Sequence, residues 1–316
     1  MFQPLVSVIM PAYNAEKYIG EAIQSIIAQT YENWELIIVE DCSNDNTLPV
    51  IKQFQDNRIH LYENDKNRGI AYSTNYAIEK SKGKYFALLD DDDYAMTDRL
   101  QLQVDYLEKH SDIDILGGMA VYMDENSEFI SVACTPRTSP KYIKAFLLLN
   151  GIDFANSTAM IRREFIEKYN IRYRDNYYGM QDARFYVESS KKGNISSIPN
   201  YIVKHRLHKE NTTKKMVGIY KEERKNKYAE LQRYSLSASG FVLDEEELGL
   251  LNRVFGELEG GFETETDIRE VYRVFQKLLR QAEDMDIDYY DELNFYLRMK
   301  FGDKIKTCKS FWKLEN

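Results

Sequence analysis

The first hundred residues alternate short apolar runs, which have the character of β-strands, with longer segments of helical periodicity. The strand-like runs lie at 6–10, 34–39, 59–62 and 85–89. The helical segments lie at about 15–29, 47–55, 70–81 and 98–109, and Thr97 is the expected N-cap of the last one. Strands that alternate with helices of this length predict an α/β fold, with a mainly parallel sheet flanked by helices on both faces.

Three polar loops follow strands of this predicted sheet, at 11–14, 40–46 and 90–93. Ligands of such sheets bind outside the carboxyl ends of the strands, so these loops are expected to share one rim. The last loop reads Asp90-Asp91-Asp92-Asp93. Four adjacent carboxylates repel one another unless a cation or full solvation relieves the repulsion. Oxygen ligands of this kind suit Mn²⁺ or Mg²⁺, and a solvated acidic turn is the alternative.

Charge and cysteine usage narrow the class of protein. The formal charge of −9 argues against nucleic acid as a partner, since phosphate backbones are neutralised by clustered Lys and Arg. Cys42, Cys134 and Cys308 share no metal-ligand spacing, which favours a reduced, cytoplasmic location. The N-terminus does not have the pattern of a signal peptide, and no apolar run approaches the ~18 residues of a membrane span. Any membrane contact is expected to be peripheral, on the inner face.

Beyond about residue 214 the character of the chain changes. Four helical segments are expected at 220–234, 245–258, 265–282 and 289–301. The pattern therefore predicts a helical C-terminal region, 215–316, appended to the α/β part.

Several motifs together carry a family resemblance. They are Val6-Ser7-Val8-Ile9-Met10-Pro11-Ala12-Tyr13-Asn14, the acidic loop at 40–47, the segment with Asn67, Gly69 and Asn75, and Leu89 followed by the four aspartates. Their order resembles that of the inverting family 2 glycosyltransferases over about residues 4–210. The resemblance implies a GT-A fold, with a catalytic domain at 1–214 whose nucleotide-binding half is about 1–110 and acceptor half about 111–214. It also implies sugar transfer with inversion from a nucleotide-diphosphate donor, expected to be a UDP-sugar, in surface polysaccharide or glycolipid synthesis.

The resemblance further implies a nucleotide-binding set. Asp41 matches the aspartate that contacts the uracil ring in relatives, although an ordinary turn with Asp45 or Thr47 as the N-cap is the alternative for this loop. Asp90 matches the first position of the family's D-x-D motif, which contacts the donor ribose or sugar. The expected set is Pro11, Ala12, Tyr13, Asn14, Asp41, Asn75, Asp90 and Asp91.

The same resemblance implies a metal site and a general base. Asp92 is the expected ligand of Mn²⁺ or Mg²⁺, with the register open by one residue within the run. His208 is expected beside the metal or diphosphate, and a structural histidine is the alternative. Asp182 matches the family's general base, and it also suits the first turn of a helix, where the macrodipole favours a carboxylate. The segment 156–163 resembles the stretch between donor and acceptor regions, or else an edge strand and a helix start.

The chain departs from the family pattern at two positions, and two other functions remain open. Cys42 precedes Ser43 where many relatives have glycine, and Thr74 stands where many have arginine. The Gln-x-x-Arg-Trp motif of processive synthases is absent, which favours single transfers. A nucleotidyltransferase is one alternative, but the loop at 11–14 lacks its glycines. An inactive family member that serves as a binding partner is another, and retention of Asp92 and Asp182 argues against it.

The C-terminal segment interleaves basic and aromatic side chains. They are Arg298, Lys300, Phe301, Lys304, Lys306, Lys309, Phe311, Trp312 and Lys313. Such a surface suits anionic lipid headgroups and hence a lipid-linked saccharide acceptor, whereas a solvated helix packed on the catalytic domain is the alternative. A free saccharide acceptor and an oligomer both remain open.

Overall fold

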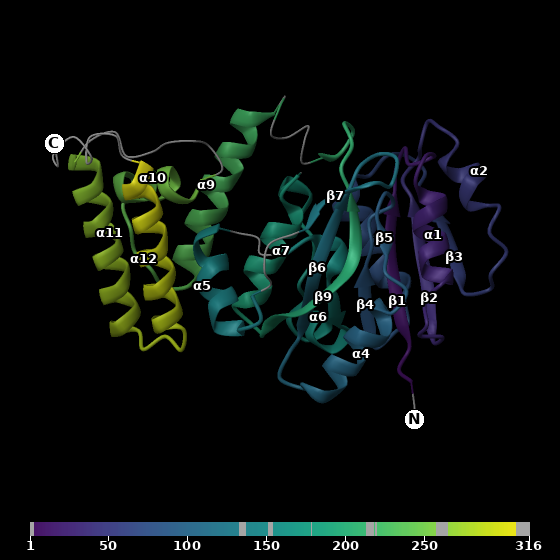
Figure 1. Ribbon diagram of the computed structural model, residues 1–316, viewed down its shortest axis with the longest axis horizontal. Coiled ribbons are helices and arrows are strands. Elements are labelled where there is room, and N and C mark those ends of the chain that lie inside the picture. Colours follow the sequence, from purple (N-terminus) through teal and green to yellow (C-terminus); the bar gives the residue numbers. More distant parts are fainter. Residues whose placement is uncertain are drawn as a thin grey trace.

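The computed structural model describes residues 3–132, 137–150, 154–177, 179–212, 218, 220–256 and 265–307. Its β-sheet and flanking helices form one end of the molecule, and a group of C-terminal helices forms the other (Figure 1). None of the helices described here is long and apolar enough to cross a membrane.

The N-terminal half of the sheet is parallel, as the sequence predicts. Its strands are β1 (Val6–Ala12), β2 (Trp34–Glu40), β3 (Ile59–Glu63) and β4 (Tyr85–Leu88), in the spatial order β3-β2-β1-β4. The connecting helices are α1 (Ile19–Ile27), α2 (Thr47–Ile51) and α3 (Ile70–Lys80), and α4 (Arg99–Lys109) follows the acidic loop. All carboxyl ends of these strands therefore meet at one edge, where the three polar loops emerge.

Some predicted boundaries are wrong. The first helix begins only at Ile19, after a turn, and α2 ends at Ile51. Helix α4 has Asp98 rather than Thr97 at its N-cap position, with no side-chain capping bond. The Thr97 carbonyl instead accepts the N–H of Thr30 at 2.8 Å, a tertiary contact that a local pattern cannot show.

The second half makes the sheet mixed. Strand β8 (Met160–Arg162) runs antiparallel to both β4 and β6 (Ile115–Met123), and β7 (Phe129–Val132) pairs with β6. The long strand β9 (Ile195–Arg206) runs parallel to β6 and pairs with the short β5 (Tyr94–Ala95), which directly follows the acidic loop. The end of β9 is thereby brought beside Asp90–Asp93.

Helices cover both faces of the sheet because neighbouring strand residues point to opposite sides. Val8 and Leu36 pack in a core with Ile23 of α1 and Leu100 and Val104 of α4. The opposite core contains Ile9, Ile37 and Phe86 of the strands. Against it pack α3, α6 (Arg163–Tyr169) and α7 (Gln181–Ser190). The sheet is thus buried on both faces, which fixes the loops at its edge.

The described residues of the C-terminal part form the helices α9 (Lys221–Ala238), α10 (Glu245–Phe255), α11 (Glu265–Asp284) and α12 (Tyr290–Thr307). They share a third core with α5 (Pro140–Asn150), in which Phe146 and Leu149 meet Leu251, Leu278 and Tyr296. The predicted helices of this region are confirmed. The predicted boundary at 214/215 lies outside the described residues.

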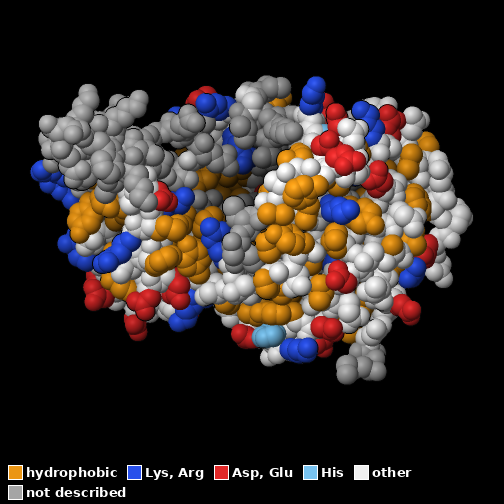
Figure 2. Space-filling view, viewed as in Figure 1, with side chains coloured by type: hydrophobic (Ala, Val, Ile, Leu, Met, Phe, Trp, Pro, Cys, Tyr) orange, Lys and Arg blue, Asp and Glu red, His pale blue; other side chains and the backbone are white. Residues whose placement is uncertain are grey.

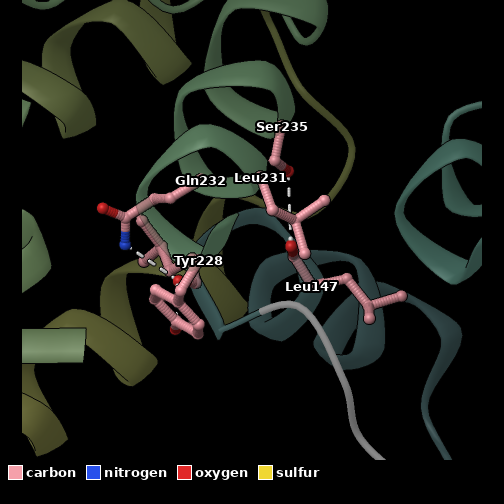
Figure 3. A pocket seen from close by; sticks show the side chains of 6 residues that line it. Leu147, Tyr228, Leu231, Gln232 and Ser235 are labelled. Carbon is pink, nitrogen blue, oxygen red and sulfur yellow. Dashed lines mark hydrogen bonds between the residues drawn. The ribbon is translucent and has the colours of Figure 1, made fainter. Parts of the chain in front are cut away.

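A polar contact joins α9 to α5 (Figure 3). Ser235 donates to the Leu147 carbonyl at 3.3 Å, and Gln232 donates to the Leu149 carbonyl at 2.9 Å. The Tyr228 hydroxyl lies 3.0 Å from the same Leu149 carbonyl. The last carbonyls of a helix have no partner within it, so these side chains supply one. The space between them is too narrow for a water molecule, so this is a packing contact and not a ligand site.

Candidate active site

The three polar loops meet, as predicted, at the carboxyl edge of the sheet. The Tyr13 N–H donates to Asp91 Oδ2 at 2.9 Å, which ties the first loop to the acidic loop. The Asn14 N–H donates to Ser43 Oγ at 3.0 Å, and Asn14 Oδ1 accepts the Asn44 N–H at 2.9 Å. Asn14 has a left-handed backbone (φ 53°), which asparagine tolerates better than most residues. Tyr13 remains largely exposed at the mouth of the site.

Asp41 shapes the wall of this site. It is only 3% exposed, and its Oδ1 accepts the Asn64 amide at 2.7 Å and the Arg68 N–H at 2.8 Å. Its Oδ2 accepts the N–H of Gly69 at 2.8 Å, where a φ of 87° requires glycine. The predicted uracil contact thus also holds the loop that leads into α3.

Asn75 links two walls of the site. Its Nδ2 donates to the Tyr173 carbonyl at 2.9 Å, and its Oδ1 accepts the Tyr173 N–H at 3.0 Å. This paired contact fixes the segment before the short 3₁₀ helix η2 (Asp175–Tyr177) against α3. Asn75 therefore has a structural role, the attachment of this segment to α3, which the sequence motif does not reveal.

The last two aspartates of the acidic run have different partners. Asp92 Oδ2 lies 2.8 Å from His208 Nε2 and 3.1 Å from Asn211 Nδ2. Asp93 is fully buried, where its Oδ2 lies 2.9 Å from His205 Nδ1. The structure therefore brings the two residues of the predicted metal site together and turns Asp93 inward, away from them.

Electrostatics distinguish the four carboxyl groups. Burial, together with the charges of Asp93 and Asp92, raises the pKa of Asp90 to about 7. Burial and the neighbouring Asp92 also raise the pKa of Asp91. Burial opposes ionisation of Asp93 as well, but the charge and hydrogen bond of His205 outweigh it and lower that pKa. The loop therefore resists carrying four negative charges, which favours a bound cation.

His205 and Asp93 form a buried contact beside the Asp92–His208 pair. Burial alone would lower the pKa of His205, but the charge of Asp93 and its hydrogen bond raise it to about 9. The two groups therefore stabilise one another as an ion pair near neutral pH. This pair anchors the end of β9 to the acidic loop.

Arg206 is buried beside the acidic loop and contacts several of the segments that surround it. It is 1% exposed, and its Nε donates to the Asp92 carbonyl at 2.9 Å. Its other nitrogens donate to Ser127 Oγ at 2.9 Å and to the Glu21 carboxylate at 2.7 Å. The guanidinium also lies over the ring of Tyr18, which in turn contacts His208. The residue thus holds the backbone of Asp92 against α1.

Asp182 lies in the first turn of α7, where its Oδ1 accepts the Ala183 N–H at 2.7 Å. Tyr186 follows four residues later on the same face of the helix. The Tyr186 hydroxyl donates to Asn156 Oδ1 at 3.0 Å, and the next residue, Ser157, accepts the Asp90 N–H at 3.2 Å. The predicted base and the acidic loop therefore border the same short segment.

The donor set fits a divalent cation that substrate helps to hold. Within the described ranges, no group of three or more His, Cys, Asp and Glu side chains could hold a metal. Asp92 and His208 would offer such a cation one oxygen and one nitrogen atom, which lie 2.8 Å apart. Mg²⁺ sites commonly combine one or two carboxylates with substrate phosphates and water, and Mn²⁺ accepts similar oxygen ligands.

Sequence reasoning missed several residues of this site. His205, Arg206 and Asn211 surround Asp92 and Asp93. Asn156 lies in the predicted segment 156–163, where the next residue, Ser157, contacts Asp90, but the sequence motifs assign Asn156 no individual role. The one local signal was His205-Arg206-Leu207-His208, a short run with three basic side chains. Only the pairing of β9 with β5 shows which of them turn toward the aspartates.

The fold and this edge define a nucleotide-diphospho-sugar transferase of the GT-A type. The comparisons with known proteins agree, and the chain belongs to glycosyltransferase family 2. The family profile "Glycosyl transferase family 2" matches residues 7–170. An uncharacterized glycosyltransferase of Haemophilus influenzae is 32% identical over 244 residues, 74% of this chain and 74% of that protein.

One further relative and one solved structure are also similar to this chain. The Escherichia coli protein WfgD, a UDP-Glc:alpha-D-GlcNAc-diphosphoundecaprenol beta-1,3-glucosyltransferase, is 31% identical over 199 residues, 61% of this chain and 73% of that protein. The crystal structure of S. aureus TarS 1-349 in complex with UDP-GlcNAc matches with a TM-score of 0.61 at 17% identity. It covers 98% of this chain and 92% of TarS 1-349. The predicted GT-A fold and glycosyltransferase function are confirmed, in a family whose typical mechanism is inverting.

Proposed function

We propose that this glycosyltransferase moves one hexosyl or N-acetylhexosaminyl group from a UDP-sugar to a hydroxyl of a lipid-linked saccharide, with Mn²⁺ or Mg²⁺. The meeting of the Asp92–His208 pair with the nucleotide loops at the sheet edge carries this proposal. Asp182 lies on the helix whose Tyr186 contacts Asn156, next to Ser157, which accepts the Asp90 N–H. The names of WfgD and of the TarS complex support a UDP donor, and that of WfgD supports a diphosphate-lipid acceptor.

Each part of the site has a task in this proposal. Asp92 and His208 would hold the cation, which when bound stabilises negative charge on the departing nucleotide. Asp182 accepts the proton of the acceptor hydroxyl while that oxygen attacks the anomeric carbon opposite the diphosphate. The bond from carbon to acceptor oxygen forms as the bond to phosphate oxygen breaks, and UDP leaves. One displacement inverts the anomeric centre without a covalent enzyme intermediate.

The uridine contact assigned to Asp41 is compatible with its internal bonds. A carboxylate has about four lone-pair sites, and three are used by Asn64, Arg68 and Gly69. We propose that Asp41 both shapes the wall and accepts from the uracil ring. The backbone of the loop at 11–14 lies beside it, since the Asp41 N–H donates to the Ala12 carbonyl at 2.9 Å.

A donor screen tests the function. Thermal shift with Mn²⁺ and UDP-Glc, UDP-Gal, UDP-GlcNAc or UDP-GalNAc should reveal stabilisation, followed by UDP release on addition of a lipid-linked saccharide. Release of pyrophosphate from a sugar phosphate and a nucleoside triphosphate would identify a nucleotidyltransferase instead. If no nucleotide sugar binds and none is hydrolysed or transferred, the inactive binding partner becomes the correct description.

We also propose a peripheral membrane contact from the cytoplasmic side, through the end that carries α11 and α12. Arg269, Tyr272 and Arg273 lie on one face of α11 and, with Ile268 and Phe301, line a groove of about 330 Å³. Tyr272 is 51% exposed. Figure 2 shows basic and hydrophobic side chains side by side at this end, with acidic ones along its lower edge. Arginine and tyrosine suit the headgroup region of an anionic bilayer.

Vesicle co-sedimentation tests this contact. Chain truncation at Asp288 would remove Leu293 and Tyr296 from the third core, so substitutions are the better probe. Arg269→Ser with Arg273→Ser should reduce pelleting with phosphatidylserine vesicles, and phosphatidylcholine vesicles serve as the control. Equal pelleting of variant and wild type excludes this face. Lys309, Phe311, Trp312 and Lys313, which the sequence also predicts to take part, lie outside the described residues, as do the side chains of Lys304 and Lys306.

A further inference from the structure

Asn156 begins the segment 156–163 and links the acidic loop to the helix that carries Asp182, and the family resemblance gives this residue no role of its own. It begins the short 3₁₀ helix η1 (Asn156–Thr158), immediately before Ser157, which accepts the Asp90 N–H at 3.2 Å. On its other side it contacts Tyr186, which shares a helix face with Asp182. Its side chain is half-buried.

Two tyrosine hydroxyls fix the orientation of the Asn156 amide. The Tyr186 hydroxyl donates to Asn156 Oδ1 at 3.0 Å, and the Tyr173 hydroxyl donates to the same oxygen at 3.2 Å. Both rings are held in place, since Tyr173 stacks on Phe185 with centroids 4.4 Å apart, and Tyr186 packs edge-on against Phe154. With the amide oxygen toward the tyrosines both hydroxyl protons have an acceptor, so this orientation satisfies more hydrogen bonds than the flipped one.

The amide nitrogen is consequently directed away from the tyrosines. In the part of the chain that the structure describes, Asn156 Nδ2 has no hydrogen-bond partner, although it is not sealed from solvent. A half-buried donor in a fixed orientation, between a donor-side carboxylate and a base, is suited to bind an oxygen of the group that passes between them.

We propose that Asn156 Nδ2 donates a hydrogen bond to an oxygen of the transferred sugar, a hydroxyl or an N-acetyl carbonyl, and so helps to determine which donor is accepted. This inference rests on the proposed function. The tyrosines act as positioning residues, because they dictate that the amide presents a donor and not an acceptor. Asn156 contacts the sugar and not the nucleotide, so the two parts of the donor can be tested separately.

The test compares UDP with UDP-Glc and UDP-GlcNAc by calorimetry in the presence of Mn²⁺. The variants are Asn156→Ala, which removes the amide, and Asn156→Asp, which keeps the acceptor for both tyrosines but replaces the donor. Both should bind UDP as wild type does and bind the preferred UDP-sugar about 3- to 10-fold more weakly relative to UDP, as expected for loss of one hydrogen bond. The ratio of the two affinities cancels any general effect that the negative charge introduced by Asn156→Asp has on binding of the nucleotide and metal.

Tyr186→Phe is the matched variant for positioning. It keeps the Asn156 amide but removes one of the two hydroxyls that orient it. The affinity for the UDP-sugar relative to that for UDP should therefore fall less than in Asn156→Ala. An unchanged ratio in Asn156→Ala overturns the inference, as does an equal loss of UDP and UDP-sugar binding, which would indicate a purely structural role. Failure of wild type to bind UDP or any UDP-sugar would refute the proposed function instead, so the two failures are distinguishable.

Discussion

Replacement of Arg206 by methionine should loosen the acidic loop, because this buried side chain holds the Asp92 backbone. The variant loses the hydrogen bonds to the Asp92 carbonyl and to Ser127, both 2.9 Å long, and the contact with Glu21. The Glu21 side chain is 52% exposed and can be rehydrated, so its loss adds little. Hydrogen bonds from a charged donor contribute about 1.5–3 kcal/mol each, and partial rehydration reduces the total to about 3 kcal/mol.

For a chain of this length, that loss corresponds to a fall in Tm of roughly 5 °C. Displacement of Asp92 should also weaken Mn²⁺-dependent UDP binding by about 10- to 100-fold, the usual effect of removing a residue that orients a metal ligand. Circular dichroism and calorimetry measure the two quantities.

Arg233→Met is the matched control for this variant. Arg233 pairs with Glu245 on the surface and is 52% exposed, so its loss should leave Tm and UDP binding unchanged. A Tm of Arg206→Met within about 1 °C of wild type, with unaltered UDP affinity, would refute the assignment of Arg206 as the residue that holds this loop.

Three further predictions concern the same edge of the sheet. Asp92→Asn should lose the Mn²⁺-dependent part of UDP binding with little change in Tm, and calorimetry that finds the same affinity with Mn²⁺ would exclude Asp92 as a metal ligand. Asp41→Ala should weaken UDP binding with or without metal. It should also lower Tm, because the Asp41 carboxylate holds the backbone that leads into α3. Unchanged UDP affinity in this variant would exclude a contact between Asp41 and uridine. The raised pKa of His205 means that its pair with Asp93 stabilises the fold fully below about pH 6.5, and that this contribution is lost as pH rises through about 9. His205→Gln should therefore flatten the decline of Tm between these pH values, and a slope equal to wild type would contradict the ion pair.

The sequence predicts the parallel half of the sheet because the strands and turns of that half are specified by neighbouring residues. Apolar runs such as 34–39 and 85–89 are bounded by turn residues, and the connections between them are short enough to leave few topologies. The meeting of the loops at 11–14, 40–46 and 90–93 follows from the parallel arrangement alone, and the structure confirms it.

The remaining features depend on contacts between distant segments. Strand β5 has two residues and exists only because β9 pairs with it, more than one hundred positions later. That pairing decides that Asp93 turns to His205 and Asp92 to His208. The orientation of Asn156 likewise depends on two tyrosines from other elements.

Helix α5 contributes apolar side chains to two separate cores. Its Ile143 and Leu147 pack toward the sheet, while Phe146, Leu148 and Leu149 pack toward the C-terminal helices. A helix that is apolar on more than one side is buried between two layers. The sequence thus contained an indication that the C-terminal helices dock on α5.

The most direct test of the proposed mechanism is Asp182→Asn, measured for donor binding and transfer in one preparation. The amide keeps the size of the side chain but cannot take the acceptor proton, so the transfer rate should fall by about 10²- to 10⁴-fold. UDP-sugar affinity with Mn²⁺ should be retained, because the proposal assigns donor binding to Asp41, Asp92 and His208. Loss of binding together with rate would make Asp182 a donor or structural residue, and an almost unchanged rate would show that another group is the base.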